Sequence, residues 1–164
     1  WKSRGLKRVI RDMVFREGSP TRRAELLVER FAVVHRVGRK LATMFVSALS
    51  TPFLAPGLAP WHPNVYGNEL VIIDTNVARA IDALSDSENG ASKSYDARTA
   101  WLKSKVSRLD LRNYHPKAPQ YSPRLIQQAL YEFCSKSNLI ARGDPCAIKH
   151  ASCSTCAPLL CPFR

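Results

Sequence analysis

The sequence predicts an all-α protein of about six short helices, and three observations carry this prediction. Apolar residues recur at helical spacing in several segments, helix start and stop signals flank those segments, and Pro- and Gly-rich stretches separate them. The 164 residues suffice for one domain with a core, and an apolar content of 45% is ordinary for a globular chain.

The first half of the chain predicts three amphipathic helices. The first has apolar residues at Leu6, Val9, Ile10, Met13 and Val14, and Gly18 ends it. Ser19 followed by Pro20 is a typical helix start, and the second helix has its apolar face at Ala24, Leu27, Val28 and Phe31. A short break, HRVG, leads into a third helix from about Arg39, with a predicted buried stripe of Leu41, Met44, Phe45 and Ala48.

The middle of the chain is rich in helix breakers. Prolines and glycines predict a loop over residues 51–68, which we expect to lie on the surface. A short extended run, ELVIID, follows, and Asp74 or Thr75 can cap the next helix, with Val77, Ala80, Ile81 and Leu84 on its apolar face. SDSENGASKS predicts a flexible polar linker.

The last third predicts two more helices. One surrounds Trp101, a Pro-rich turn covers 112–123, and the other has its apolar face at Leu125, Ile126, Ala129, Leu130 and Phe133. We expect Cys134 to be a small core residue.

The charge of the chain points to a polyanionic partner. Lys and Arg number 25 against 13 acids, giving a net charge of +12. Such an excess favours contact with nucleic acid, although charge alone specifies neither base sequence nor chemistry.

No apolar run approaches the roughly 20 residues of a membrane span, and no signal peptide is visible, so we expect no membrane contact and a reducing compartment.

Four of the five cysteines lie close together near the end of the sequence. Cys146, Cys153, Cys156 and Cys161 have the spacing C-x6-C-x2-C-x4-C. Disulfides need an oxidising compartment, and structural zinc usually takes two C-x2-C pairs where this cluster has one. Four thiolates suit an iron–sulfur cluster, and zinc or a metal-free core remain the alternatives.

Two further segments carry residues suited to chemistry on DNA. HRVGRKLA reads as a turn between helices, and backbone N–H groups at such a turn, next to a helix N-terminus, can hold a phosphate. An amine that attacks a sugar carbon must be unprotonated, and Arg39 and a helix N-terminus beside Lys40 disfavour its ammonium form. The carboxylate of Asp74 could stabilise the cationic sugar that forms as a base departs. The simpler readings are a solvated surface Lys40 and a helix-capping Asp74.

The order of these segments resembles the helix–hairpin–helix base-excision DNA glycosylases, in particular the endonuclease III-like branch. The matching segments are VHRVGRKLA at 34–42, IDTNVARAI at 73–81 and the cysteines at 146–161. The resemblance implies a partial helix–hairpin–helix glycosylase fold whose N-terminal helices are missing. It divides the chain into a helical domain at 1–133, with the hairpin at 34–40 and the Pro-rich insertion at 51–68, and a C-terminal cluster loop at 134–164.

The resemblance also implies an activity. The family's matching Lys, here Lys40, forms a Schiff base with the sugar, and its matching Asp, here Asp74, assists base loss. The expected enzyme is a monomeric DNA glycosylase with AP-lyase activity, acting on double-stranded DNA with a damaged or mismatched base in the cytoplasm or nucleoid, or in a nucleus. The residues expected to contact DNA are Arg36, Val37, Gly38, Arg39 and Lys149. A [4Fe–4S] cluster is expected on Cys146, Cys153, Cys156 and Cys161.

Some positions depart from the family's pattern. Arg36 stands where the hairpin has its first Gly and His35 where it has Pro, and Arg takes a positive φ at a higher energetic cost than Gly. The last cysteine gap is one residue shorter than in the family, and the segment between Lys40 and Asp74 is longer.

Two alternatives to a glycosylase with AP-lyase activity remain. One is a monofunctional mismatch or adenine glycosylase of the same superfamily, against which Lys40 argues. The other is a non-catalytic iron–sulfur DNA-binding module.

Overall fold

The computed structural model describes residues 16–85 and 94–135, together with Gly5, Arg8, Arg11, Asp12, Ser137 and Ile140. Within these residues all regular structure is helical, and five α-helices and one short 3-10 helix have defined bounds. The prediction of an all-α chain is therefore confirmed. Residues 86–93 of the predicted polar linker and most of the first predicted helix lie outside the described residues. None of the described helices is long and apolar enough to cross a membrane.

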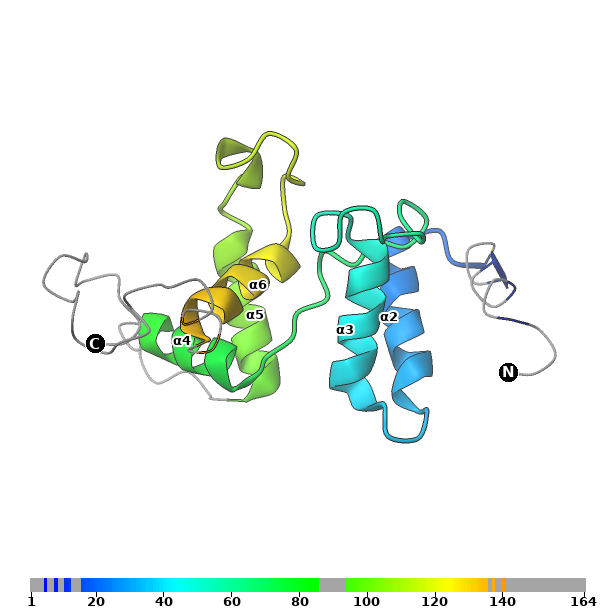
Figure 1. Cartoon of the computed structure of the whole chain (residues 1–164), viewed down its shortest axis with the longest axis horizontal. Helices are drawn as coiled ribbons and strands as arrows, with labels where there is room; N and C mark the ends of the chain where they lie inside the picture. The colour runs from blue at the N-terminus through cyan, green and yellow to red at the C-terminus, as the bar shows by residue number, and fades with distance from the viewer. Residues whose placement is uncertain are drawn as a thin grey trace, which may run out of the picture. The chain divides into compact units, whose positions relative to one another are not determined.

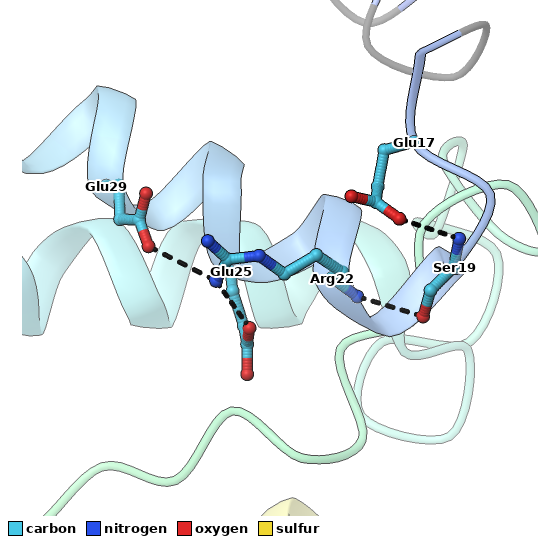
Figure 2. Close-up of polar contacts among 5 residues, drawn as sticks. All are labelled: Glu17, Ser19, Arg22, Glu25 and Glu29. Atoms are coloured by element: carbon cyan, nitrogen blue, oxygen red, sulfur yellow. Dashed lines mark hydrogen bonds and ion pairs between the residues drawn. The ribbon is translucent and has the colours of Figure 1, made fainter.

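The chain divides into two units, and the first is built on a helical hairpin. This unit comprises Trp1–Val71 and Leu111–Arg124. Its helices α2 (Pro20–Ala32) and α3 (Gly38–Ser50) lie side by side, joined by a short turn (Figure 1). Ser19 caps α2, because its Oγ accepts a hydrogen bond from the Arg22 backbone N–H at 3.3 Å (Figure 2). The predicted start of this helix at Ser19 and Pro20 is confirmed.

The core of the first unit lies between these two helices and the loop that follows. Ala24, Leu27 and Val28 of α2 are buried, as the sequence predicts. On α3 the prediction is wrong: Leu41 is 52% exposed and Phe45 44% exposed, and Met44 is similarly exposed. The buried face of α3 consists mainly of small residues: Ala42, Thr43, Val46, Ser47 and Ser50.

The Pro-rich segment 51–68 is more than the surface loop that its composition predicts. Val65 is buried within the core cluster, and Trp61 packs against that cluster. The Trp61 ring lies parallel to Phe31, with centroids 6.4 Å apart, and it meets Phe45 edge to face at 5.7 Å. Through Trp61 the segment therefore packs against one aromatic ring from each helix of the hairpin.

The second unit contains the remaining helices. It comprises Ile72–Asp110 and Leu125–Arg164, with α4 (Thr75–Ser85), α5 (Tyr95–Val106) and all but the first two residues of α6 (Pro123–Cys134). Val77, Ala80 and Ile81 are buried on α4 as predicted. Residues 69–74 precede α4 without forming a strand. The backbone N–H of Ile72 donates instead to Gln127 Oε1 at 3.4 Å.

The buried face of α6 differs from the predicted one. Cys134 is buried, as expected, but Ala129 and Phe133 are exposed and Leu125, Ile126 and Leu130 are half-buried. Arg124 and Gln127 are buried in their place. Arg124 Nε donates to Ser47 Oγ at 3.2 Å within the first unit, and burial lowers the pKa of Arg124 to about 10. The buried side of α6 is thus partly polar and hydrogen-bonded, which an apolar periodicity cannot reveal.

Candidate nucleic-acid interface

The turn between α2 and α3 is tightly hydrogen-bonded. The Val34 N–H donates to the Phe31 carbonyl and the Val37 N–H to the Val34 carbonyl, both at 3.0 Å. Two residues of the turn are left-handed: Arg36 has φ 63° and Gly38 has φ 60°. The turn therefore reverses the chain within a few residues and starts α3 at Gly38.

Arg36 adopts a conformation that a glycine would adopt more easily. A non-glycine residue in the left-handed region costs roughly 1–2 kcal/mol, because its Cβ approaches the backbone. Arg36 thus takes the left-handed conformation in this turn despite that cost. The Arg36 side chain adds a guanidinium that can contact an anion, at a position where glycine would offer only its backbone N–H.

Cations gather at this end of the hairpin. Arg36, Arg39 and Lys40 are exposed, and Arg30 in the last turn of α2 and His35 in the connecting turn are exposed as well. The first turn of α3 contains no acidic residue. Among the residues that the structure describes, none accepts a hydrogen bond or ion pair from the side chains of Arg36, Arg39 or Lys40. Their positive charge is therefore available to an external anion.

The N-terminus of α3 also differs from those of its neighbours. Side-chain oxygens cap α2 at Ser19, α4 at Asp74 and α5 at Ser94. The residue before α3 is Val37, which offers no side-chain acceptor, and no cap hydrogen bond forms there. The first N–H groups of α3 and the positive end of its dipole are thus left for water or for a bound anion.

The two residues predicted to be catalytic belong to different units. Lys40 is the third residue of α3 in the first unit, and its side chain is exposed. Asp74 lies in the second unit, is half-buried, and caps α4 by accepting the Val77 N–H at 2.8 Å on Oδ1. Within the described part of the chain no side chain or N–H group donates to its other oxygen, Oδ2.

The remaining predicted site residues lie outside the described residues. They are Lys149, predicted to contact DNA, and the proposed cluster ligands Cys146, Cys153, Cys156 and Cys161. Across residues 16–85 and 94–135, no three His, Cys, Asp or Glu side chains gather in a way that could hold a metal ion.

Sequence reasoning missed an exposed aromatic residue, Tyr114, in the turn predicted at 112–123. Its side chain is 77% exposed, next to exposed Arg112, His115 and Lys117. The available signal was an aromatic residue between cations in a Pro-containing segment. The composition of the segment alone predicts only a turn.

No protein-family model, curated protein or solved structure matches this chain. A function must therefore be inferred from the residues themselves, above all from the open start of α3, the cations around it and the carboxylate of Asp74.

Proposed function

We propose that this chain is a DNA glycosylase with AP-lyase activity, which holds the DNA backbone at the start of α3. One observation carries the proposal: the uncapped N-terminus of α3 lies among the exposed cations Arg36, Arg39 and Lys40, with no acid in its first turn. A helix N-terminus with free N–H groups suits a phosphate, and the net charge of +12 suits a polyanion.

The chemistry assigned to Lys40 is attack on the sugar. An enzyme of this type flips the damaged nucleotide out of the duplex so that its sugar becomes accessible. The unprotonated amine of Lys40 forms a bond to C1′ while the bond from C1′ to the base breaks, and the base leaves with the electron pair and takes up a proton. The bond from C1′ to the ring oxygen then breaks, the oxygen takes up a proton, and a Schiff base forms between C1′ and the amine. Loss of a proton from C2′ forms a double bond between C2′ and C3′, and the phosphate oxygen leaves C3′ with the electron pair.

Asp74 would act on the first of these steps. Base departure places positive charge on the sugar, and a carboxylate within reach stabilises that charge. Oδ1 accepts the Val77 N–H, and this capping bond holds the side chain in one orientation. A cap and an electrostatic role are compatible for the same carboxylate.

The four C-terminal cysteines would hold a [4Fe–4S] cluster with a structural role. The donor set fits, since four thiolates in one short segment are what such a cluster requires. Purified protein should then absorb broadly at about 400 nm and contain iron. Zinc without iron in a metal analysis would exclude the cluster.

A second candidate is a DNA-binding module without catalysis. The exposure of Lys40 favours it, because a solvated lysine at a helix start commonly serves as a phosphate contact. Binding and catalysis therefore have to be tested separately.

A duplex with one abasic site provides that test, since it requires no knowledge of the excised base. Borohydride added during turnover should reduce the Schiff base and link the protein to the DNA. Lys40→Ala and Lys40→Arg should both abolish linkage and strand nicking, and Lys40→Arg should retain the wild-type affinity because it keeps the charge. Tight binding by the wild type without any linkage or nicking would favour the binding module. Base release from a damaged duplex without linkage would indicate a monofunctional glycosylase.

A further inference from the structure

The segment 111–120, which we name the 111–120 loop, is a closed and well-anchored loop of the first unit. It begins with the 3-10 helix η2 (Leu111–Asn113), and the side chain of Leu111 is buried. The Leu111 N–H donates to the Gln120 carbonyl at 3.0 Å and closes the neck of the loop. The N–H groups of Tyr114 and His115 both donate to the Leu111 carbonyl at 3.1 Å. Hydrogen bonds within the loop therefore fix its backbone.

This anchored loop presents an aromatic ring to solvent. The Tyr114 side chain is 77% exposed, although burial of a Tyr ring would stabilise the fold. Next to it in sequence, the His115 ring meets Phe53 edge to face, with centroids 5.0 Å apart, and Phe53 is itself 40% exposed. The backbone N–H of Lys117 donates to His115 Nδ1 at 3.3 Å, which fixes the orientation of the imidazole. Two rings thus meet at the surface, and Tyr114 is the residue before His115 in the chain.

The charges of the loop are all of one sign. Arg112 and Lys117 are exposed on either side of Tyr114, and LRNYHPKAPQ contains neither Asp nor Glu. An exposed ring between cations is the combination that single-stranded nucleic acids require, since bases stack on the ring while the cations contact phosphates. A contact with phosphate alone would need the cations and not the ring. An acidic peptide would likewise be held by the charges alone and would not need the exposed ring.

From this arrangement we propose that the 111–120 loop binds an unpaired stretch of DNA, with a base stacked on Tyr114 and the backbone held by Lys117. The inference rests on the proposed function for its choice of nucleic acid and extends that function with a second, single-stranded contact. A protein that flips a nucleotide out of the helix works on locally unpaired DNA, so such a contact would favour gapped or unwound sites.

The test compares two DNA probes with the full chain: a blunt duplex and the same duplex with a single-stranded thymidine tail of about ten nucleotides, within the usual site size of single-strand binders. The wild type should bind the tailed duplex more tightly. Tyr114→Ala should weaken binding of the tailed duplex by about 5- to 150-fold, the range found for loss of one stacked base, and leave the blunt duplex unaffected. Tyr114→Phe is the matched control, because it keeps the ring, and it should bind both probes as the wild type does.

The outcomes separate this inference from the proposed function. If the wild type binds the blunt duplex but gains nothing from the tail, or if Tyr114→Ala matches the wild type on the tailed probe, the stacking contact is refuted while DNA binding stands. If only Lys117→Ala weakens binding, and equally for both probes, the loop is an electrostatic contact and the stacking proposal is also refuted. If the wild type binds neither probe, the proposed function and this inference fail together.

Discussion

Arg98 of α5 holds Asp82 of α4 through two parallel hydrogen bonds. Arg98 Nε donates to Asp82 Oδ1 at 2.9 Å, and Nη2 donates to Oδ2 at 2.7 Å. The two side chains are 17% and 28% exposed, so water screens the pair only in part. The hydrogen bond to Asp82 raises the pKa of Arg98 above its ordinary value, and burial opposes this rise. This bidentate pair is a specific polar link between α4 and α5.

The first prediction concerns the stability of that link. Arg98→Ala should lower the free energy of unfolding by about 1–2 kcal/mol, because it removes two charge-assisted hydrogen bonds and leaves the Asp82 carboxylate half-buried without them. Arg98→Lys should recover only part of the loss, since an ammonium cannot make both bonds in parallel. The midpoint of urea denaturation measures both effects.

Arg22 provides the matched control on α2. Its Nη1 lies 2.8 Å from Glu25 Oε2 and 3.4 Å from Glu29 Oε1, and all three side chains are well exposed (Figure 2). Solvent screens such surface pairs, so Arg22→Ala should leave the midpoint nearly unchanged. If Arg22→Ala lost as much stability as Arg98→Ala, solvent exposure would not explain the difference expected between the two ion pairs.

The second prediction concerns Gly67, which lies against α3. A Cβ at this position would overlap Ser50 Oγ and would lie 3.0 Å from the Ser47 Cα. Because backbone cannot move aside as a side-chain end can, Gly67→Ala should lower the free energy of unfolding by about 1–3 kcal/mol. Gly18→Ala is the control, since nothing lies within 4 Å of a Cβ there, and its urea midpoint should match that of the wild type. Equal midpoints for the two variants would refute the packing argument.

The sequence predicted where helices begin better than it predicted which of their faces are buried. Starts depend on local signals such as Ser19 followed by Pro20, or Asp74 before Thr75, and these were confirmed. Burial on α3 depends on the partner instead. Small residues such as Ala42 and Ser47 are buried, whereas the more apolar stripe that includes Leu41 stays exposed. Both faces show helical spacing, so periodicity alone could not choose between them.

The candidate site was predictable in the same limited sense. The turn at 34–40 and the cap at Asp74 follow from local sequence, because both depend on residues a few positions apart. The parallel rings of Trp61 and Phe31 and the hydrogen bond from Arg124 to Ser47 join residues far apart in the chain. No local pattern encodes such pairs. For the same reason the composition of the Pro-rich segment predicts a surface position, although Val65 lies in the core.

The third prediction is a loss of stability at alkaline pH. Burial, and next the carboxylate of Glu69, raise the pKa of the Tyr121 phenol above its ordinary value of 10.0. Above pH 10 the unfolded chain therefore releases this proton more readily than the folded chain, and the free energy of unfolding falls as pH rises. Tyr121→Phe should make the alkaline decline shallower, and Glu69→Gln should bring the phenol pKa closer to its ordinary value. Ultraviolet titration of the phenols and urea denaturation across this pH range measure the two effects. An unchanged alkaline slope in Tyr121→Phe would exclude this residue as the cause.

The fourth prediction separates the stability of the α2–α3 turn from its binding function. Arg36 occupies a left-handed conformation at φ 63°, which glycine adopts without the Cβ penalty. Arg36→Gly should therefore raise the free energy of unfolding by up to about 1 kcal/mol, since the greater freedom of glycine in the unfolded chain offsets part of the relief. The same change removes an exposed cation beside the start of α3. Affinity for duplex DNA should fall, and the slope of log K against log salt should become shallower by about 1, as expected for one lost phosphate contact.

Arg39→Ala is the comparison for this variant, because Arg39 lies within α3 and carries the neighbouring charge. It should weaken DNA binding and flatten the salt slope in the same way, but it should not reproduce the gain in stability, since it relieves no left-handed residue. Thermal or urea denaturation and a salt titration of binding are needed on both variants. If Arg36→Gly gains stability while its affinity and salt slope stay at wild-type values, the turn is strained for some purpose other than phosphate contact. If it loses both stability and affinity, the Arg36 side chain supports the turn itself, and the assignment of this residue to the DNA interface is wrong.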